Sequence, residues 1–76
     1  MTHQAISGET PFQVLAHSFA VSPSEQTYTL MYSSDGIAYT GYADKTPANE
    51  TLVVNDIAKG MWFYLSGNTS EVTITY

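Results

Sequence analysis

The sequence predicts an all-β fold, a small antiparallel sandwich of six short strands, on three observations. Apolar residues recur with a period of two, as in EVTITY at the end of the chain, and this period is typical of strands with one buried face. Turn-forming residues separate the runs at short intervals, as they do in β-sandwiches and barrels. Asp35-Gly36 lies between two runs rich in Tyr and Thr, and such a pair is the strongest short signal for a hairpin.

Chain length limits the size of the core. The 76 residues form one domain, and folding at this size buries only about 60% of the surface that the unfolded chain exposes. No cysteine is present, so neither a disulfide nor a thiolate zinc site can stabilise the fold. We therefore expect a single sandwich domain over residues 1–76, in which residues 1–11 form an N-terminal arm.

The first strand is expected over residues 12–21, within PFQVLAHSFAVSPSE. Pro23 ends it, because proline has no N–H to donate to a neighbouring strand. A short helix in VLAHSFA is the competing interpretation.

The second and third strands are expected over residues 27–33 and 37–42, on either side of Asp35-Gly36. A two-residue type I′ turn would join them, with positive φ at both central residues. Alternation along the first of these strands places two sets of side chains on opposite faces: Tyr28, Leu30 and Tyr32 on one, and Thr27, Thr29, Met31 and Ser33 on the other.

Three more strands follow the polar loop ADKTPANE. TLVVN over residues 51–55 has Leu52 and Val54 on one side, and Gly60 turns the chain into MWFYL. SGNTS is expected to be a hairpin connection to EVTITY. The last strand then points alternate residues inward: Val72, Ile74 and Tyr76.

Two segments within residues 26–76 are similar to a known family. YTLMYSSDG with the strand after it resembles the middle hairpin of fibronectin type III modules, and LVVNDIAKGMWFYL resembles the L-x-V-x-x-L-x-x-G-x-x-Y segment before their penultimate strand. Phe63 stands where that family has the tyrosine of its corner, and the chain is short of the seven strands of such a sandwich. The resemblance implies a reduced immunoglobulin-like sandwich with an open edge.

The segment MWFYL carries more large apolar side chains than one face of a strand can bury. If Phe63 points inward, the period of two takes Met61 and Leu65 into the core and leaves Trp62 and Tyr64 on the opposite face. Trp and Tyr are the residues most enriched at interface hot spots. In the alternative register, shifted by one residue, Trp62 and Tyr64 fill the core and Phe63 lies outside.

The predicted interface therefore consists of five residues: Trp62, Tyr64, Met31, Tyr39 and Tyr42. We expect that the protein is not an enzyme and that it binds no cofactor and no metal ion. His17 lies in an apolar run and His3 near the start of the chain. The sequence therefore places neither histidine beside a nucleophilic side chain that it could activate as a base. The loop acids, Asp35, Asp44, Glu50 and Asp56, show neither the spacing of a glycosidase pair nor a calcium-loop pattern.

Charge narrows the choice of partners. Seven acidic residues and two lysines give a formal charge of −5, which opposes binding to nucleic acid or to an anionic membrane. No signal peptide and no run of about 20 apolar residues is found, so we expect synthesis in the cytoplasm. Asn49-Glu50-Thr51 and Asn68-Thr69-Ser70 fit the glycosylation pattern, but are better explained as turns.

Two functions fit these expectations. The texture YTLMYSSDG…GNTSEVTITY resembles the auxiliary or decoration proteins of tailed, crAss-like phage capsids. That resemblance implies a structural protein of the virion that docks onto a larger assembly, with the major capsid protein as partner.

The alternative is a carbohydrate-binding module, in which Trp62, Tyr64, Tyr39 and Tyr42 stack on sugar rings. Asn68, Asp35 or Gln13 would then orient the sugar hydroxyls. Geometry separates the two functions, because sugars need a coplanar strip of rings, whereas a protein partner needs mixed aromatic and aliphatic side chains with a polar rim. Met31 favours a protein partner.

Overall fold

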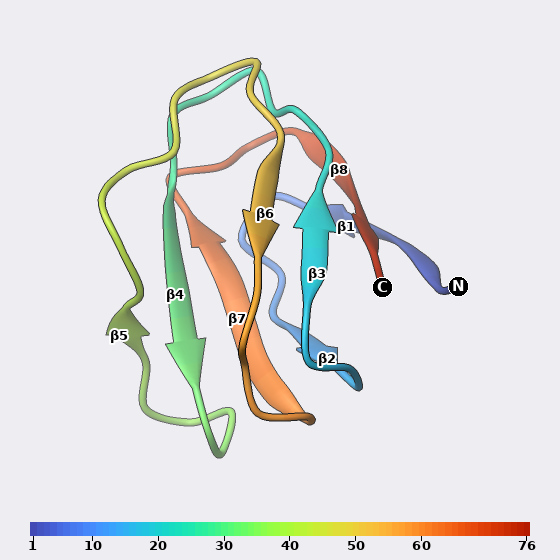
Figure 1. Ribbon diagram of the computed structural model, residues 1–76. Coiled ribbons are helices and arrows are strands. Elements are labelled where there is room, and N and C mark those ends of the chain that lie inside the picture. Colours follow the sequence, from blue (N-terminus) through green and yellow to red (C-terminus); the bar gives the residue numbers. More distant parts are fainter.

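The computed structural model describes residues 1–76, which form two antiparallel four-stranded sheets and no helix (Figure 1). In chain order the strands are β1 (His3–Ser7), β2 (Phe12–Val14), β3 (Phe19–Val21), β4 (Thr29–Ser33), β5 (Thr40–Gly41), β6 (Leu52–Val54), β7 (Met61–Ser66) and β8 (Glu71–Thr75). The β8 sheet has the order β1-β8-β3-β6, and the β7 sheet has the order β2-β7-β4-β5. The all-β class is confirmed, but the strands number eight rather than six.

The inner faces of both sheets supply one hydrophobic core, which makes the arrangement sandwich-like. Phe19 of the β8 sheet and Phe63 of the β7 sheet have ring centroids 4.7 Å apart. Phe12 packs against both, with centroids 5.8 Å from Phe19 and 5.9 Å from Phe63. Three aromatic rings from three strands thus tie the two sheets together at the centre of a small domain.

The register of β7 agrees with the predicted one. Phe63 and Leu65 are fully buried, and Met61 packs against the core. Trp62 and Tyr64 are half-buried and point to the outer face. The alternative register, with Trp62 in the core, is wrong.

The single strand expected over residues 12–21 is instead divided between the two sheets. β2 pairs with β7, and β3 pairs with β6 and β8. The buried residues of β2 have even numbers and those of β3 have odd numbers, so one continuous strand could not point all of them inward. Residues 15–18 carry the chain from one sheet to the other, and the competing helix is not formed.

Residues 1–11, expected to form an arm, contain β1. It pairs with β8 along its whole length, from His3 opposite Thr75 to Ser7 opposite Glu71. Ile6 is the only buried residue of β1, which is why the sequence shows no alternating apolar pattern there.

The β4–β5 hairpin is confirmed, with Met31 opposite Gly41 and Tyr32 opposite Thr40. Its turn is not type I′. Gly36 has a φ of 77°, but Asp35 does not have the positive φ that this turn also requires. Residues 34–39 instead form a longer loop between the strands.

SGNTS is not a hairpin connection, because β7 and β8 belong to different sheets. In an immunoglobulin sandwich the last strand lies beside the penultimate strand, in one sheet. Here β8 lies between β1 and β3 in the opposite sheet (Figure 1). The strand order therefore differs from the order that the fibronectin resemblance implied.

Candidate functional site

The outer face of the β7 sheet carries the aromatic residues that the core leaves out. Trp62 and Tyr64 extend from β7 toward this face, with Met31 of β4 opposite Tyr64. Cross-strand partners in a sheet point to the same side, so Met31 and Tyr64 lie next to each other. We call Met31, Tyr39, Trp62 and Tyr64 the aromatic face.

Tyr39 joins this face from the loop before β5. Its ring meets the Tyr64 ring edge-on, with centroids 4.8 Å apart and planes at 76°. The Tyr39 hydroxyl is shielded from water and has no hydrogen-bond partner. Removal from water raises the pKa of Tyr39, and the nearby Tyr64 and Asp35 raise it further. The phenol is therefore neutral at physiological pH, and the face carries no charge of its own.

Trp62 is covered from outside by the backbone of the loop 34–39. A Cβ placed on Gly36 would lie 3.3 Å from three atoms of the indole ring. Only glycine lets the backbone approach so closely, and its φ of 77° also favours glycine. One face of the indole is thus occupied by the protein itself, which explains why Trp62 is half-buried on an outer face.

The side chains of Ser33 and Asp35 hold this loop in shape. The Ser33 hydroxyl oxygen accepts hydrogen bonds from the N–H of Asp35 at 3.2 Å and of Gly36 at 2.9 Å. It also donates to the Asp35 carboxylate at 2.7 Å. That carboxylate accepts from the N–H of Ile37 at 2.9 Å and of Ala38 at 3.2 Å. The Ile37 bond, with the bonds from Ser33 and Ala38, lowers the pKa of Asp35.

Ile37, at the outer end of this loop, is 84% exposed. The sequence pattern predicts Ile37 at the start of the strand over residues 37–42 and does not indicate it as a site residue. A signal was present, because Ser and Asp two residues apart favour local bonds from side chain to backbone over strand pairing. The loop 34–39 thus presents an apolar side chain on a hydrogen-bonded frame.

Four of the five predicted interface residues come together, and one does not. Met31, Tyr39, Trp62 and Tyr64 form the aromatic face described above. Tyr42 instead packs edge-on against Tyr32, with ring centroids 5.9 Å apart. Tyr32 belongs to the inward-pointing set of β4 and packs against the core, so Tyr42 lies at the sheet edge, away from the aromatic face.

Asn68 lies in a buried polar network and is only 2% exposed. Its amide nitrogen donates to the carbonyls of Gly8 at 3.0 Å and Ser70 at 2.8 Å, and its amide oxygen accepts from the Ser24 hydroxyl at 2.6 Å. This burial is incompatible with a role as glycan acceptor or sugar contact in the folded chain. Gln13, beside Trp62 in the sheet, donates to the carbonyl of Gly60 at 3.1 Å.

The histidines and acids considered as catalytic residues lie apart. His17 is exposed, and its ring Nδ1 lies 2.9 Å from the carbonyl oxygen of Ile57. The loop acids do not cluster, and no three His, Asp or Glu side chains are placed so that they could hold one metal ion. The chain also contains no helix of the length and hydrophobicity that crossing a membrane requires.

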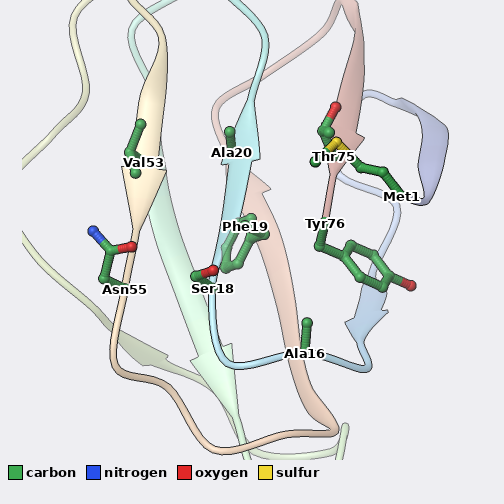
Figure 2. A pocket seen from close by; sticks show the side chains of 9 residues that line it. All are labelled: Met1, Ala16, Ser18, Phe19, Ala20, Val53, Asn55, Thr75 and Tyr76. Carbon is green, nitrogen blue, oxygen red and sulfur yellow. The ribbon is translucent and has the colours of Figure 1, made fainter.

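A second surface feature lies across β3, β6 and the end of β8. It is an open hollow of about 290 Å³, and no charged side chain lines it (Figure 2). Val53, which is 60% exposed, stands at its border on the edge strand β6. The remaining lining residues also carry no charged side chain: Met1, Ala16, Ser18, Phe19, Ala20, Asn55, Thr75 and Tyr76.

The fold and these surfaces define a small all-β protein of two four-stranded sheets, with an aromatic face on one sheet and an uncharged hollow on the other. No protein-family model, no curated protein and no solved structure matches the chain.

Proposed function

We propose that this protein is a non-enzymatic interaction module that docks onto a larger protein assembly through Ile37 and the aromatic face. The observation that carries the proposal is the 84% exposure of Ile37 on a loop that is hydrogen-bonded internally and seated on Trp62. Because the loop is already ordered, docking costs little conformational entropy. Ile37 would fill an apolar pocket of the partner, and the aromatic face would exclude water around it.

Ring geometry favours a protein over a carbohydrate as the ligand. Tyr39 and Tyr64 are nearly perpendicular and do not form a flat strip. One side of the Trp62 indole is closed by Gly36. Met31 adds an aliphatic side chain to the face. Mixed shapes of this kind suit the irregular surface of a protein, whereas a sugar ring stacks on an open, flat aromatic side chain.

As the assembly we propose a virus capsid, to which the chain binds as a small auxiliary protein. This part rests on the resemblance of the sequence texture to decoration proteins of tailed phages. The formal charge of −5 adds a requirement, because the partner surface around the pocket must be neutral or basic to avoid repulsion. The major capsid protein is the proposed partner, and the virion the proposed location.

Co-sedimentation with assembled particles tests the proposal. A tagged form of the protein is expressed in cells in which the particles assemble. The particles are isolated on a density gradient, and the amount of tagged protein bound to them is measured. We expect the wild-type chain to band with particles. Ile37→Ala should lower the bound fraction by about tenfold or more, as hot-spot truncations do.

Val53→Ala is the matched control, because it shortens another exposed aliphatic side chain, on the opposite sheet. Its binding should equal that of the wild type. A chain that never bands with particles contradicts the capsid assignment. If the Ile37→Ala and Trp62→Ala variants both bind particles as well as the wild type does, the proposed docking surface is wrong.

A further inference from the structure

β1 is an open edge strand, and the longest of the four in the molecule. It spans five residues, whereas β6 and β2 span three each and β5 spans two. Edge strands expose unpaired backbone groups, and proteins protect them with lysine, proline or bulges. His3–Ser7 contains no lysine and no proline, and it pairs with β8 in continuous register. Its outer edge is therefore a ready template for another strand.

The hydrogen-bond pattern identifies which backbone groups of β1 are free. Thr2 and Tyr76 exchange two backbone hydrogen bonds, and the N–H of Gly8 donates to the carbonyl of Ser70. Bonded and non-bonded residue pairs alternate along an antiparallel ladder, so the intervening bonds to β8 come from Gln4 and Ile6. The residues between them point their N–H and C=O groups away from β8: His3, Ala5 and Ser7. The Ser7 carbonyl already accepts from the N–H and the hydroxyl of Thr10, so the free groups are the N–H of all three residues and the C=O of His3 and Ala5.

The geometry points to β1 as a homodimer interface, in which β1 pairs antiparallel with β1 of a second copy about a two-fold axis. Ala5 would lie opposite the partner's Ala5, and His3 opposite the partner's Ser7. The two Ala5 residues would exchange both of their backbone hydrogen bonds, and each Ser7 N–H would donate to the carbonyl of the partner's His3, while the Ser7 carbonyl stays bonded to Thr10. The β8 sheets of the two copies would then form one continuous sheet. A two-fold arrangement closes on itself, so association stops at the dimer.

Charge favours a second copy as the occupant of this edge. β1 carries no acidic or lysine side chain, so pairing two copies places no like charges in the seam despite the net charge of the chain. Glu71 lies opposite Ser7 on β8. The two-fold axis therefore brings His3 of each copy to the same outer face as the partner's Glu71, with only the small Ser7 between them.

The other edges do not share this property. On β6, a two-fold pairing centred on Val53 would set Glu50 opposite the partner's Asp56, and like charges directly opposite are destabilising. β2 and β5 are shorter. Self-pairing is thus specific to β1, and it does not depend on the aromatic face.

Sedimentation of the full 76-residue chain over a wide range of concentration tests this inference. We expect the mass to rise from the 8.3 kDa monomer to a dimer. Ala5→Lys places two lysines together at the two-fold axis and should raise the dimer Kd about tenfold or more. Val53→Lys is the matched control, because it adds the same charge to the other edge strand of the same sheet, and its Kd should equal that of the wild type. Circular dichroism shows that each variant is folded.

Ala5→Pro provides a second variant. The N–H it removes faces the free edge, where proline is tolerated, so the fold should persist while the dimer is lost. In amide exchange of the wild type, His3, Ala5 and Ser7 should become protected as concentration rises, whereas Gln4 and Ile6 are protected throughout. A chain that remains monomeric, or a dimer that both Ala5 variants leave unchanged, overturns the inference. A dimer that Val53→Lys disrupts also overturns it.

Discussion

At the scale of single residues, the aromatic face depends on the contact between Gly36 and Trp62. The register predicted first from the sequence, one of two left open, takes Trp62 out of the core, and the structure agrees, since Phe63 and Leu65 take the inward positions of β7. The sequence did not show what covers Trp62, because the closing contact comes from the backbone of a loop and has no apolar pattern. That contact explains how a large aromatic side chain on an outer face can be half-buried.

Gly36→Val should destabilise the fold by about 1 kcal/mol or more, because a side chain there requires strained backbone and displaces the indole. A Cβ at this position meets the Trp62 ring at 3.3 Å, and φ is 77°. Urea unfolding followed by circular dichroism measures the change. Gly41→Ala is the control, since nothing lies within 4 Å of a Cβ there. Equal unfolding curves for Gly36→Val and the wild type would contradict the contact.

Asp35→Asn should remove part of the pH dependence of stability. The pKa of Asp35 is lower in the fold than in the unfolded chain, chiefly through the N–H of Ile37. Its stabilisation is therefore complete above the ordinary value of 3.8 and is lost as pH falls through the lower, folded value. Urea unfolding at several pH values should show wild type and Asp35→Asn diverging at neutral pH and converging in acid. Asp44→Asn, in an exposed loop, is the control; a constant difference across pH would contradict this prediction.

At the scale of elements, the sequence predicted strands well where they alternate cleanly and poorly where the chain changes sheet. β4, β7 and β8 lie where the period of two placed them. The division between β2 and β3 could have been predicted from the residue numbers. Val14 has an even number and Phe19 an odd one, so one continuous strand would point these two apolar side chains to opposite faces. The crossing from β7 to β8 could not have been predicted, since SGNTS has the composition of a hairpin turn. Only tertiary contacts distinguish a hairpin turn from a connection between the two sheets.

Those contacts are polar and centre on Asn68, where the loop after β7 meets the loops after β1 and β3. The Asn68 amide bonds to Gly8, Ser24 and Ser70 from a nearly fully buried position. Gln26 adds a bond from its side-chain oxygen to the N–H of Thr69 at 3.1 Å. A buried network of this kind fixes the path of the chain between sheets, because each of its groups would be costly to leave without a partner.

Asn68→Ala should therefore lower the free energy of unfolding by about 2 kcal/mol or more, since it leaves the Gly8 carbonyl without its partner and takes one hydrogen bond each from the Ser70 carbonyl and the buried Ser24 hydroxyl. Thermal and urea unfolding measure the loss. Asn55→Ala, at an exposed position after β6, is the matched control and should change stability by less than about 0.5 kcal/mol. A loss for Asn68→Ala as small as that of the control would show that the network does not hold the connection.

At the scale of the whole molecule, strands that are neighbours in space are mostly distant in sequence. β1 pairs with β8, β2 with β7, and β3 with both β6 and β8, so only β4 and β5 form a local hairpin. The entropy of closing long loops must be overcome before most of these pairs form, which slows folding. The two ends of the chain nevertheless lie side by side, joined by the reciprocal backbone bonds of Thr2 and Tyr76 (Figure 1).

A circular permutant should fold faster than the natural order for this reason. Joining Tyr76 to Met1 through Asn-Gly makes β8 and β1 a local hairpin, and new ends at the exposed residues 44–45 break no strand. Stopped-flow refolding followed by Trp62 fluorescence measures the rate, which should rise by about tenfold if closing β1 against β8 limits folding. The linear chain with the same Asn-Gly added after Tyr76 is the control. An unchanged or slower rate would place the limiting step in the pairing of β4 with β7, because these two strands lie farther apart in sequence in the permutant than in the natural order.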